Sequence, residues 1–135
     1  MSPKTLMIIP MLGLVGLLSA CAGPMPKADP HQAWIGLQEE TQNDMLAERL
    51  DGKKIDDGRY FEVKPGAHRL QVMLFEERTN DDDQTCQAEV DYSKFKAGEH
   101  YRLVQSSLGE DLHASLEDSH GKTVAQTDNF DCMPG

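Results

Sequence analysis

Apolar side chains recur at every second position in several short segments from residue 59 onward. In an extended strand alternate side chains point to opposite faces, so each segment predicts a strand with one buried face. The predicted buried faces are Phe61 and Val63; Leu70, Val72 and Leu74; Cys86, Ala88 and Val90; Tyr101 and Leu103; and Leu112, Ala114 and Leu116. Trp34-Ile35-Gly36-Leu37 is the first segment expected to be ordered, and Lys122 to Gln126 the last short strand.

The segments between these strands carry turn-forming residues. Asp51-Gly52 before Lys53-Lys54-Ile55 is a strong hairpin signal. Lys64-Pro65-Gly66 predicts a hairpin turn in which Gly66 adopts a positive φ. Further turns are expected at Lys96 to Glu99 and Asp118 to Gly121, a polar loop at Glu76 to Gln84, and a tail at Asp128 to Gly135 held by Cys132.

The segment Met45 to Leu50 fits two structures. Leu46 and Leu50 suit one face of a short helix that Gly52 would cap. Leu46, Glu48 and Leu50 also suit one face of a strand, and this is preferred because the surrounding pattern is strand-like. About seven to nine short strands with frequent turns predict an all-β domain, a small antiparallel sandwich or barrel, over residues 33–135. One polar face per strand favours antiparallel pairing.

The first 20 residues follow a different pattern. Lys4 precedes the uncharged apolar run Leu6 to Leu18, and the small residues Ser19-Ala20 follow it. These are the three parts of a secretory signal. A bilayer-spanning helix needs about 20 apolar residues, so the run is too short for a stable anchor. An ordinary signal peptide followed by a chance cysteine, or an N-terminal membrane anchor, are the alternatives.

Leu18-Ser19-Ala20-Cys21 resembles the lipobox of bacterial lipoproteins. The resemblance implies cleavage after Ala20 and a diacylglyceryl group on the Cys21 sulfur, usually with a third acyl chain on its amine. Two or three chains hold a protein on a bilayer essentially permanently. Ala22, in place of the Asp that commonly retains such proteins at the inner membrane, implies the inner leaflet of a Gram-negative outer membrane.

Residues 21–32 are predicted to be a lipidated tether. Pro24, Pro26 and Pro30 interrupt any periodicity, and eleven residues in extended form reach roughly 35 Å. Cleavage would leave 115 residues, the size of one domain, and removal of Lys4 would change the net charge from −10 to −11. Such a domain lacks the basic stripe that nucleic acid requires, so nucleic acid is not an expected partner. The acidity itself is typical of a soluble envelope protein.

Cys86 and Cys132 remain once Cys21 is lipidated. Spare cysteines in even number usually pair in an exported chain, so we expect a disulfide between them. The alternative, a zinc site, is disfavoured because the sequence lacks the closely spaced pairs of ligands that zinc sites have. No cofactor is expected.

A second resemblance lies in Asp51 to Lys54, Tyr60 to Val63 and Pro65 to Val72. These residues are similar to PEGA-type and related uncharacterised lipoprotein domains, which implies an immunoglobulin-like sandwich. Small periplasmic lysozyme inhibitors are another exported, disulfide-bonded β family, but the Ser-Ala-Ser-Gly-type loop of their better-known members is missing here.

Several side chains are candidates for chemistry, each with a plainer interpretation. Asp81, Asp82 and Asp83 offer oxygens to calcium but lack the order of an EF-hand, so a solvated loop is preferred. A nucleophilic site would need a base and an elbow around Ser106 or Ser107. Candidate metal ligands or pH sensors are His68, His100, His113 and His120, but they are scattered along the chain and chance is the better explanation. Candidate sugar-stacking residues are Trp34, Tyr60, Phe75 and Tyr92, for most of which core packing is the preferred explanation.

The sequence therefore predicts a non-enzymatic envelope lipoprotein. Its expected partners are the bilayer, through acylated Cys21, and an envelope protein or cell-wall component. The alternative is an inhibitor of a cationic enzyme such as lysozyme, acting through the acidic loop Thr79 to Gln84. An enzyme would require a clustered, buried polar site.

Overall fold

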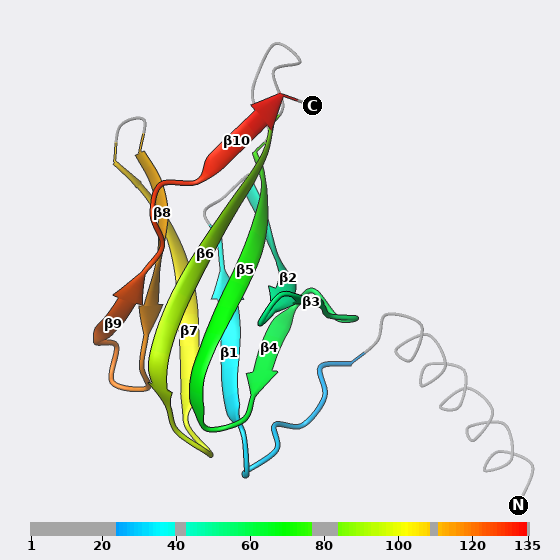
Figure 1. Ribbon diagram of the computed structural model, residues 1–135, viewed down its shortest axis with the longest axis vertical. Coiled ribbons are helices and arrows are strands. Elements are labelled where there is room, and N and C mark those ends of the chain that lie inside the picture. Colours follow the sequence, from blue (N-terminus) through cyan, green and yellow to red (C-terminus); the bar gives the residue numbers. More distant parts are fainter. Residues whose placement is uncertain (1–23, 40–42, 77–83, 109–110, 135) are drawn as a thin grey trace, which may run out of the picture.

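The computed structural model describes residues 24–39, 43–76, 84–108 and 111–134. This part consists of ten strands in two five-stranded sheets that pack face to face (Figure 1). The first sheet has the spatial order β4 (Tyr60–Val63), β1 (Ala33–Gln38), β7 (His100–Leu108), β8 (Asp111–Glu117), β9 (Thr123–Gln126). The second has the order β10 (Asp131–Pro134), β6 (Gln84–Phe95), β5 (Gly66–Glu76), β2 (Asn43–Leu50), β3 (Lys53–Lys54). No helix long and apolar enough to cross a membrane occurs among these residues.

The core lies between the sheets and is built from the predicted alternating faces. Leu70, Val72 and Leu74 of β5 are fully buried, and their partners on β6 are equally enclosed. Burying one such side chain stabilises the fold by about 1.5–3 kcal/mol. The remaining members include Ile35, Phe61, Val63, Cys86, Val90, Tyr101, Leu103, Ala114 and Leu116. The all-β sandwich is therefore confirmed.

Strand number and direction differ from the prediction in two respects. The described residues form ten strands instead of the predicted seven to nine. The count rises because the short segment Lys53–Lys54 forms a strand of its own, β3, and because the predicted tail forms β10. Pairing is antiparallel except between β1 and β7, which run parallel with Trp34 opposite His100. Both strands start at the same end of the sandwich (Figure 1), and a pattern with one polar face cannot reveal that. Met45 to Leu50 is strand, as preferred, within β2.

The Pro65-Gly66 turn is real, but the hairpin prediction was wrong. β4 belongs to the first sheet and β5 to the second, so the turn carries the chain from one sheet to the other. Gly66 has the expected positive φ of 116° and starts β5 next to a bulge. The Asp51-Gly52 turn does form a hairpin between β2 and β3.

Gly66→Ala is expected to lower the free energy of unfolding by about 1–3 kcal/mol, because an L side chain is strained at this φ. A Cβ at Gly66 meets no atom within 4 Å, so the cost is one of backbone conformation alone. Gly36→Ala is the matched control, since its Cβ also has open space and its φ is ordinary. Urea unfolding of both variants checks the difference, and equal midpoints would contradict it.

The last residues of the predicted tether are attached to the domain. The Asp29 amide donates to the Glu62 carboxylate at 2.9 Å, and the Gly98 amide donates to the Gln32 carbonyl at 2.9 Å. His31 contacts the Asp29 carboxylate at 3.2 Å. These contacts fix the end of the predicted tether, from Asp29 to Gln32, against the domain.

Candidate functional site

Two of the predicted sites lie outside the described residues. The predicted cleavage and lipidation sequence, Leu18, Ser19, Ala20 and Cys21, is one, and the loop carboxylates Asp81 to Asp83 are the other. The predicted disulfide is present between Cys86 and Cys132. The two cysteines are directly opposed on β6 and β10, with Cα atoms 3.9 Å apart, and Cys86 is fully buried. The disulfide thus joins the C-terminal strand to the core of the second sheet.

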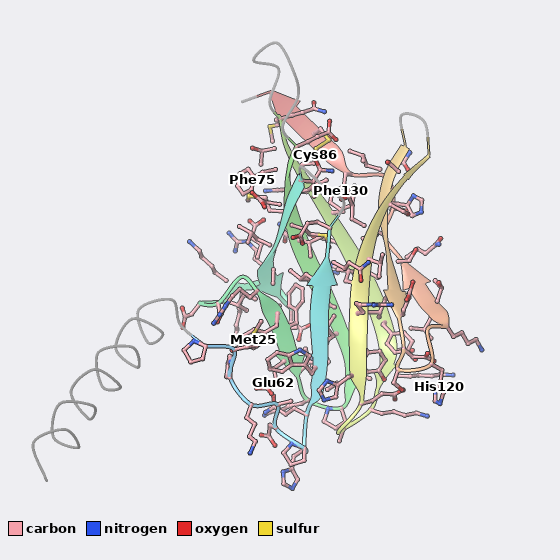
Figure 2. The ribbon with its side chains drawn as sticks, turned by 180° about the vertical axis from the view of Figure 1, so that it is seen from behind. Met25, Glu62, Phe75, Cys86, His120 and Phe130 are labelled. Carbon is pink, nitrogen blue, oxygen red and sulfur yellow. A yellow bond between two sulfur atoms is a disulfide. The ribbon has the colours of Figure 1, made fainter. Side chains whose placement is uncertain are left out.

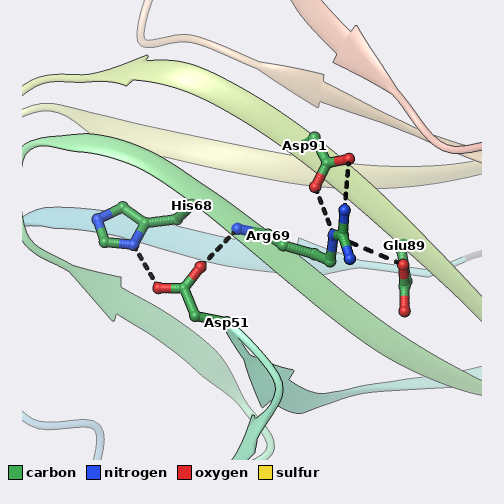
Figure 3. A network of polar contacts seen from close by, with 5 residues as sticks. All are labelled: Asp51, His68, Arg69, Glu89 and Asp91. Carbon is green, nitrogen blue, oxygen red and sulfur yellow. Dashed lines mark hydrogen bonds and ion pairs between the residues drawn. The ribbon is translucent and has the colours of Figure 1, made fainter.

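A polar network covers the outer face of the second sheet (Figure 3). Arg69 on β5 is bonded to Asp91 on β6, its Nε donating at 2.8 Å, and lies 3.7 Å from a Glu89 oxygen. Asp51, in the β2–β3 turn, accepts the Arg69 amide at 2.8 Å and contacts His68 Nδ1 at 2.7 Å. The network connects two strands, β5 and β6, with the β2–β3 turn.

His68 lies between two acceptors. Its Nδ1 faces the Asp51 carboxylate and its Nε2 faces the Lys64 carbonyl, each at 2.7 Å. A carbonyl oxygen only accepts, and so does an ionised carboxylate, so both contacts are satisfied together when both ring nitrogens carry protons. The backbone bond from Arg69 and then the bond from His68 lower the pKa of Asp51. His68 therefore joins the Asp51-Gly52 turn to the start of β5, a structural role instead of the metal or pH-sensing role considered for it from the sequence.

We expect Asp51→Asn to destabilise the domain at neutral pH, by roughly 0.5–1.5 kcal/mol for the lost charge-assisted bond. A carboxyl group with a lowered folded pKa contributes stability above its unfolded value of 3.8, and the contribution is lost as pH falls through the folded pKa. The difference between parent and variant should thus be full above about pH 5 and shrink below about pH 4. Urea unfolding across this range measures it, and a constant difference would contradict the assignment.

An open groove of about 1060 Å³ surrounds this network. It runs from the Asp51-Gly52 turn across β5 and β6 to Lys122, Thr123 and Val124 at the start of β9. Arg69, Glu89 and Asp91 are all more than half exposed, so their ion pairs are solvated and individually weak. The groove is thus lined mainly by polar and charged side chains.

Ser106 and His113 form a contact that the sequence did not predict. They are directly opposed on β7 and β8, and the Ser106 Oγ lies 3.0 Å from His113 Nε2. His113 also borders a shallow hollow with residues 126–129. A serine beside a base is the first requirement of nucleophilic catalysis. Within the described part of the chain, however, no carboxylate hydrogen-bonds to the second ring nitrogen, so the orienting acid of a triad is missing there.

One cluster places metal-ligating atoms together. Single atoms of Glu99, Asp118 and His120 lie within 4.8 Å of one another, at the turns that precede β7 and β9. Both Glu99 oxygens already accept hydroxyl bonds, from Tyr101 and Ser119 at 3.1 Å each. Asp118 accepts the amides of His120 and Lys122, which lower its pKa. A divalent cation would have to compete with these hydrogen-bond donors. In the structure the bonds of Glu99 and Asp118 instead stabilise the two neighbouring turns.

The four candidate stacking aromatics are dispersed. Trp34 and Tyr60 stack on the outer face of the first sheet, with ring centroids 4.2 Å apart. Tyr92 packs edge-on against Phe95 and Tyr101 at one end of the core. Phe75 lies on the outer face of the second sheet, so a single sugar-binding platform of all four is excluded. His100 lies 6.5 Å from the Trp34 ring.

Three of the four large apolar side chains that are exposed among the described residues lie on the outer face of the second sheet, and we call them the distal patch: Leu46, Phe75 and Met133. They are 41%, 39% and 63% exposed, on β2, β5 and β10 of the second sheet. Phe75 and Met133 both pair with Thr85 of β6, which places them in one row across the outer face. Figure 2 shows Phe75 projecting from the sheet near Cys86 and Phe130, with Met25 and Glu62 toward the other end.

Charged side chains border the distal patch: several carboxylates, and Arg59, which lines one hollow with Leu46 and Phe75. Asp44 lies directly opposite Phe75 on the neighbouring strand, and Glu76 follows Phe75 in the chain. Asp131 precedes the disulfide on β10 and is exposed. An apolar centre inside a charged rim is typical of a protein-binding surface.

Comparisons with protein families, with curated proteins and with solved structures gave no match for this chain.

Proposed function

We propose that this chain is a cell-envelope lipoprotein, anchored through acylated Cys21, whose β-sandwich is a non-enzymatic binding module facing the periplasm. The lipobox and the preceding apolar run support the anchor. The absence of Asp after Cys21 favours the inner leaflet of an outer membrane. The immunoglobulin-like character implied by the second resemblance belongs to the same proposal.

The observation that carries the binding function is the position of the distal patch. The chain enters the sandwich at the start of β1, and the patch lies toward the opposite end (Figures 1 and 2). The eleven residues of β5 span about 35 Å between these ends. A partner at the patch would therefore be met well away from the lipid headgroups, where a soluble or cell-wall-bound molecule has access.

A second candidate is inhibition of a cationic enzyme such as lysozyme. The acidic rim of Asp44, Glu76 and Asp131 favours it, because complementary charge steers association with a basic surface. The loop Thr79 to Gln84, expected to act in this way, joins β5 to β6 and lies largely outside the described residues.

Phe75 replaced by a photoreactive phenylalanine analogue should crosslink to a partner in intact cells, because this side chain is exposed at the centre of the patch. The same analogue at Thr123, exposed on β9 toward the entry end, is the matched control. Leu46→Asp should abolish the crosslink, since it places a charge inside the apolar centre. Equal crosslinking at Phe75 and Thr123 would contradict the proposed surface.

The lysozyme alternative has its own test. Soluble protein that starts after Cys21 should slow the enzyme at low salt and lose the effect at high salt. Asp44→Asn with Asp131→Asn should weaken it, while Asp56→Asn, an exposed carboxylate before β4, should not. Full lysozyme activity in the presence of excess parent protein would exclude the inhibitor function and leave binding of another envelope partner as the proposal.

A further inference from the structure

We propose that the entry end of the sandwich, where β1 begins, faces an anionic lipid surface and that the domain stands upright on it. The inference rests on the anchor of the proposed function but concerns a different surface from the distal patch. It follows from an uneven distribution of charge between the two ends of the sandwich.

Unpaired lysines gather at the entry end. Lys64 lies in the turn between β4 and β5, and Lys94 and Lys96 lie at the end of β6 and in the turn that follows. Lys27 lies in the segment that leads into β1. All four are exposed, and none forms a salt bridge within the described residues. Figure 1 shows these turns together at the end where the chain enters.

The carboxylates at the entry end are held by the protein itself. Glu62 accepts the Asp29 amide, and Asp29 accepts the His31 amide at 2.9 Å. Glu117 is ion-paired with Arg102 at 3.1 Å. Glu99 and Asp118 close the neighbouring turns. Their hydrogen bonds fix them close to the surface of the domain, whereas the long lysine side chains extend beyond it toward solvent.

The distal end has the opposite character. Its described carboxylates, on strand ends and connections, are Glu39, Asp44, Glu76, Asp128 and Asp131. Arg59 shares a hollow with Glu39 and Asp44, but its guanidinium is bound by Asp57 at 2.6 Å.

Because salt screens charges over short distances, the difference in charge between the two ends determines which end faces the lipid. At physiological ionic strength charges interact over about 8 Å, far less than the roughly 35 Å between the two ends. In the upright position only the entry end lies within reach of the lipid charge, and its lysines favour an anionic surface. A domain lying flat would bring the distal carboxylates against the same lipid, where repulsion opposes it.

Lysine footprinting of the full-length lipoprotein in vesicles tests the orientation. The vesicles contain phosphatidylcholine alone or with about a third phosphatidylglycerol, and mass spectrometry follows acetylation of each lysine. On anionic vesicles the labelling rates of Lys64, Lys94 and Lys96 should fall by about twofold or more, because headgroups within a Debye length restrict access. Lys53 and Lys54, exposed on β3, are the internal controls and should keep their rates.

Salt and variants separate the outcomes. The protection should disappear at about 1 M salt, where the Debye length is about 3 Å. It should also disappear at Lys94 in Lys64→Gln/Lys96→Gln, whereas Lys53→Gln/Lys54→Gln should leave the protection of Lys64, Lys94 and Lys96 unchanged. Equal rates on both vesicle types, or protection of Lys53 and Lys54, would overturn the upright orientation while leaving the anchor intact. Failure of the parent to float with neutral vesicles would overturn the anchor, and the orientation with it.

Discussion

Reduction of the Cys86–Cys132 disulfide is expected to lower the free energy of unfolding by about 4 kcal/mol, because the bond closes a long loop in the unfolded chain. For a domain of this size the melting temperature should fall by roughly 10–20 °C. The native state also depends on the bond, since β10 has only four residues and pairs with β6 alone. Guanidinium unfolding with and without reductant measures the change.

The double variant Cys86→Ala/Cys132→Ala is the control for chemical side effects of the reductant. It should unfold close to the reduced parent, with a small further loss because Cys86 is fully buried and alanine is smaller. In the native, unreduced parent neither cysteine should react with an alkylating agent. Reaction of both would contradict the bond.

Cys21→Ser should abolish attachment to membranes, because serine lacks the thiol that would accept the diacylglyceryl group. The chain should remain an uncleaved precursor or leave the lipid fraction, and labelling by a fatty-acid probe should fall to background. Cys86→Ser/Cys132→Ser is the matched control, which should keep its label despite a weakened fold. Unchanged labelling of Cys21→Ser would remove the lipoprotein proposal.

The buried faces of the strands were predictable from sequence, and the assignment of strands to sheets was not. Leu70, Val72 and Leu74 alternate with polar residues, so their burial follows from the period of two. The same period cannot show that the turn at Gly66 changes sheets, because a crossing and a hairpin need the same turn chemistry. β10 was missed because Asp131 to Pro134 has no apolar alternation; its place comes from pairing with β6.

The candidate sites show the same division. The disulfide was predictable because exported chains pair their spare cysteines, whatever the fold. The contact of Ser106 with His113 depends on the register of β7 against β8, which no local signal gives. The distal patch was only partly predictable. Phe75 lies opposite the predicted buried face of Leu74, so its exposure follows from the alternation. Leu46 was placed on one face with Leu50, and only the burial of Met45 and Ala47 shows that Leu46 faces outward.

The parallel pairing of β1 with β7 sets an order of folding. The β2–β3 and β5–β6 pairs join segments that are close in sequence, so loop closure is cheap and these ladders can form early. Trp34 can pair with His100 only after the intervening chain, which contains most of the second sheet, has been synthesised. Under the proposed export and N-terminal anchoring, β1 would therefore remain beside the membrane with one edge unpaired until β7 has been exported. We expect this interval, rather than any step in the second sheet, to be when the protein is most exposed to aggregation and proteolysis.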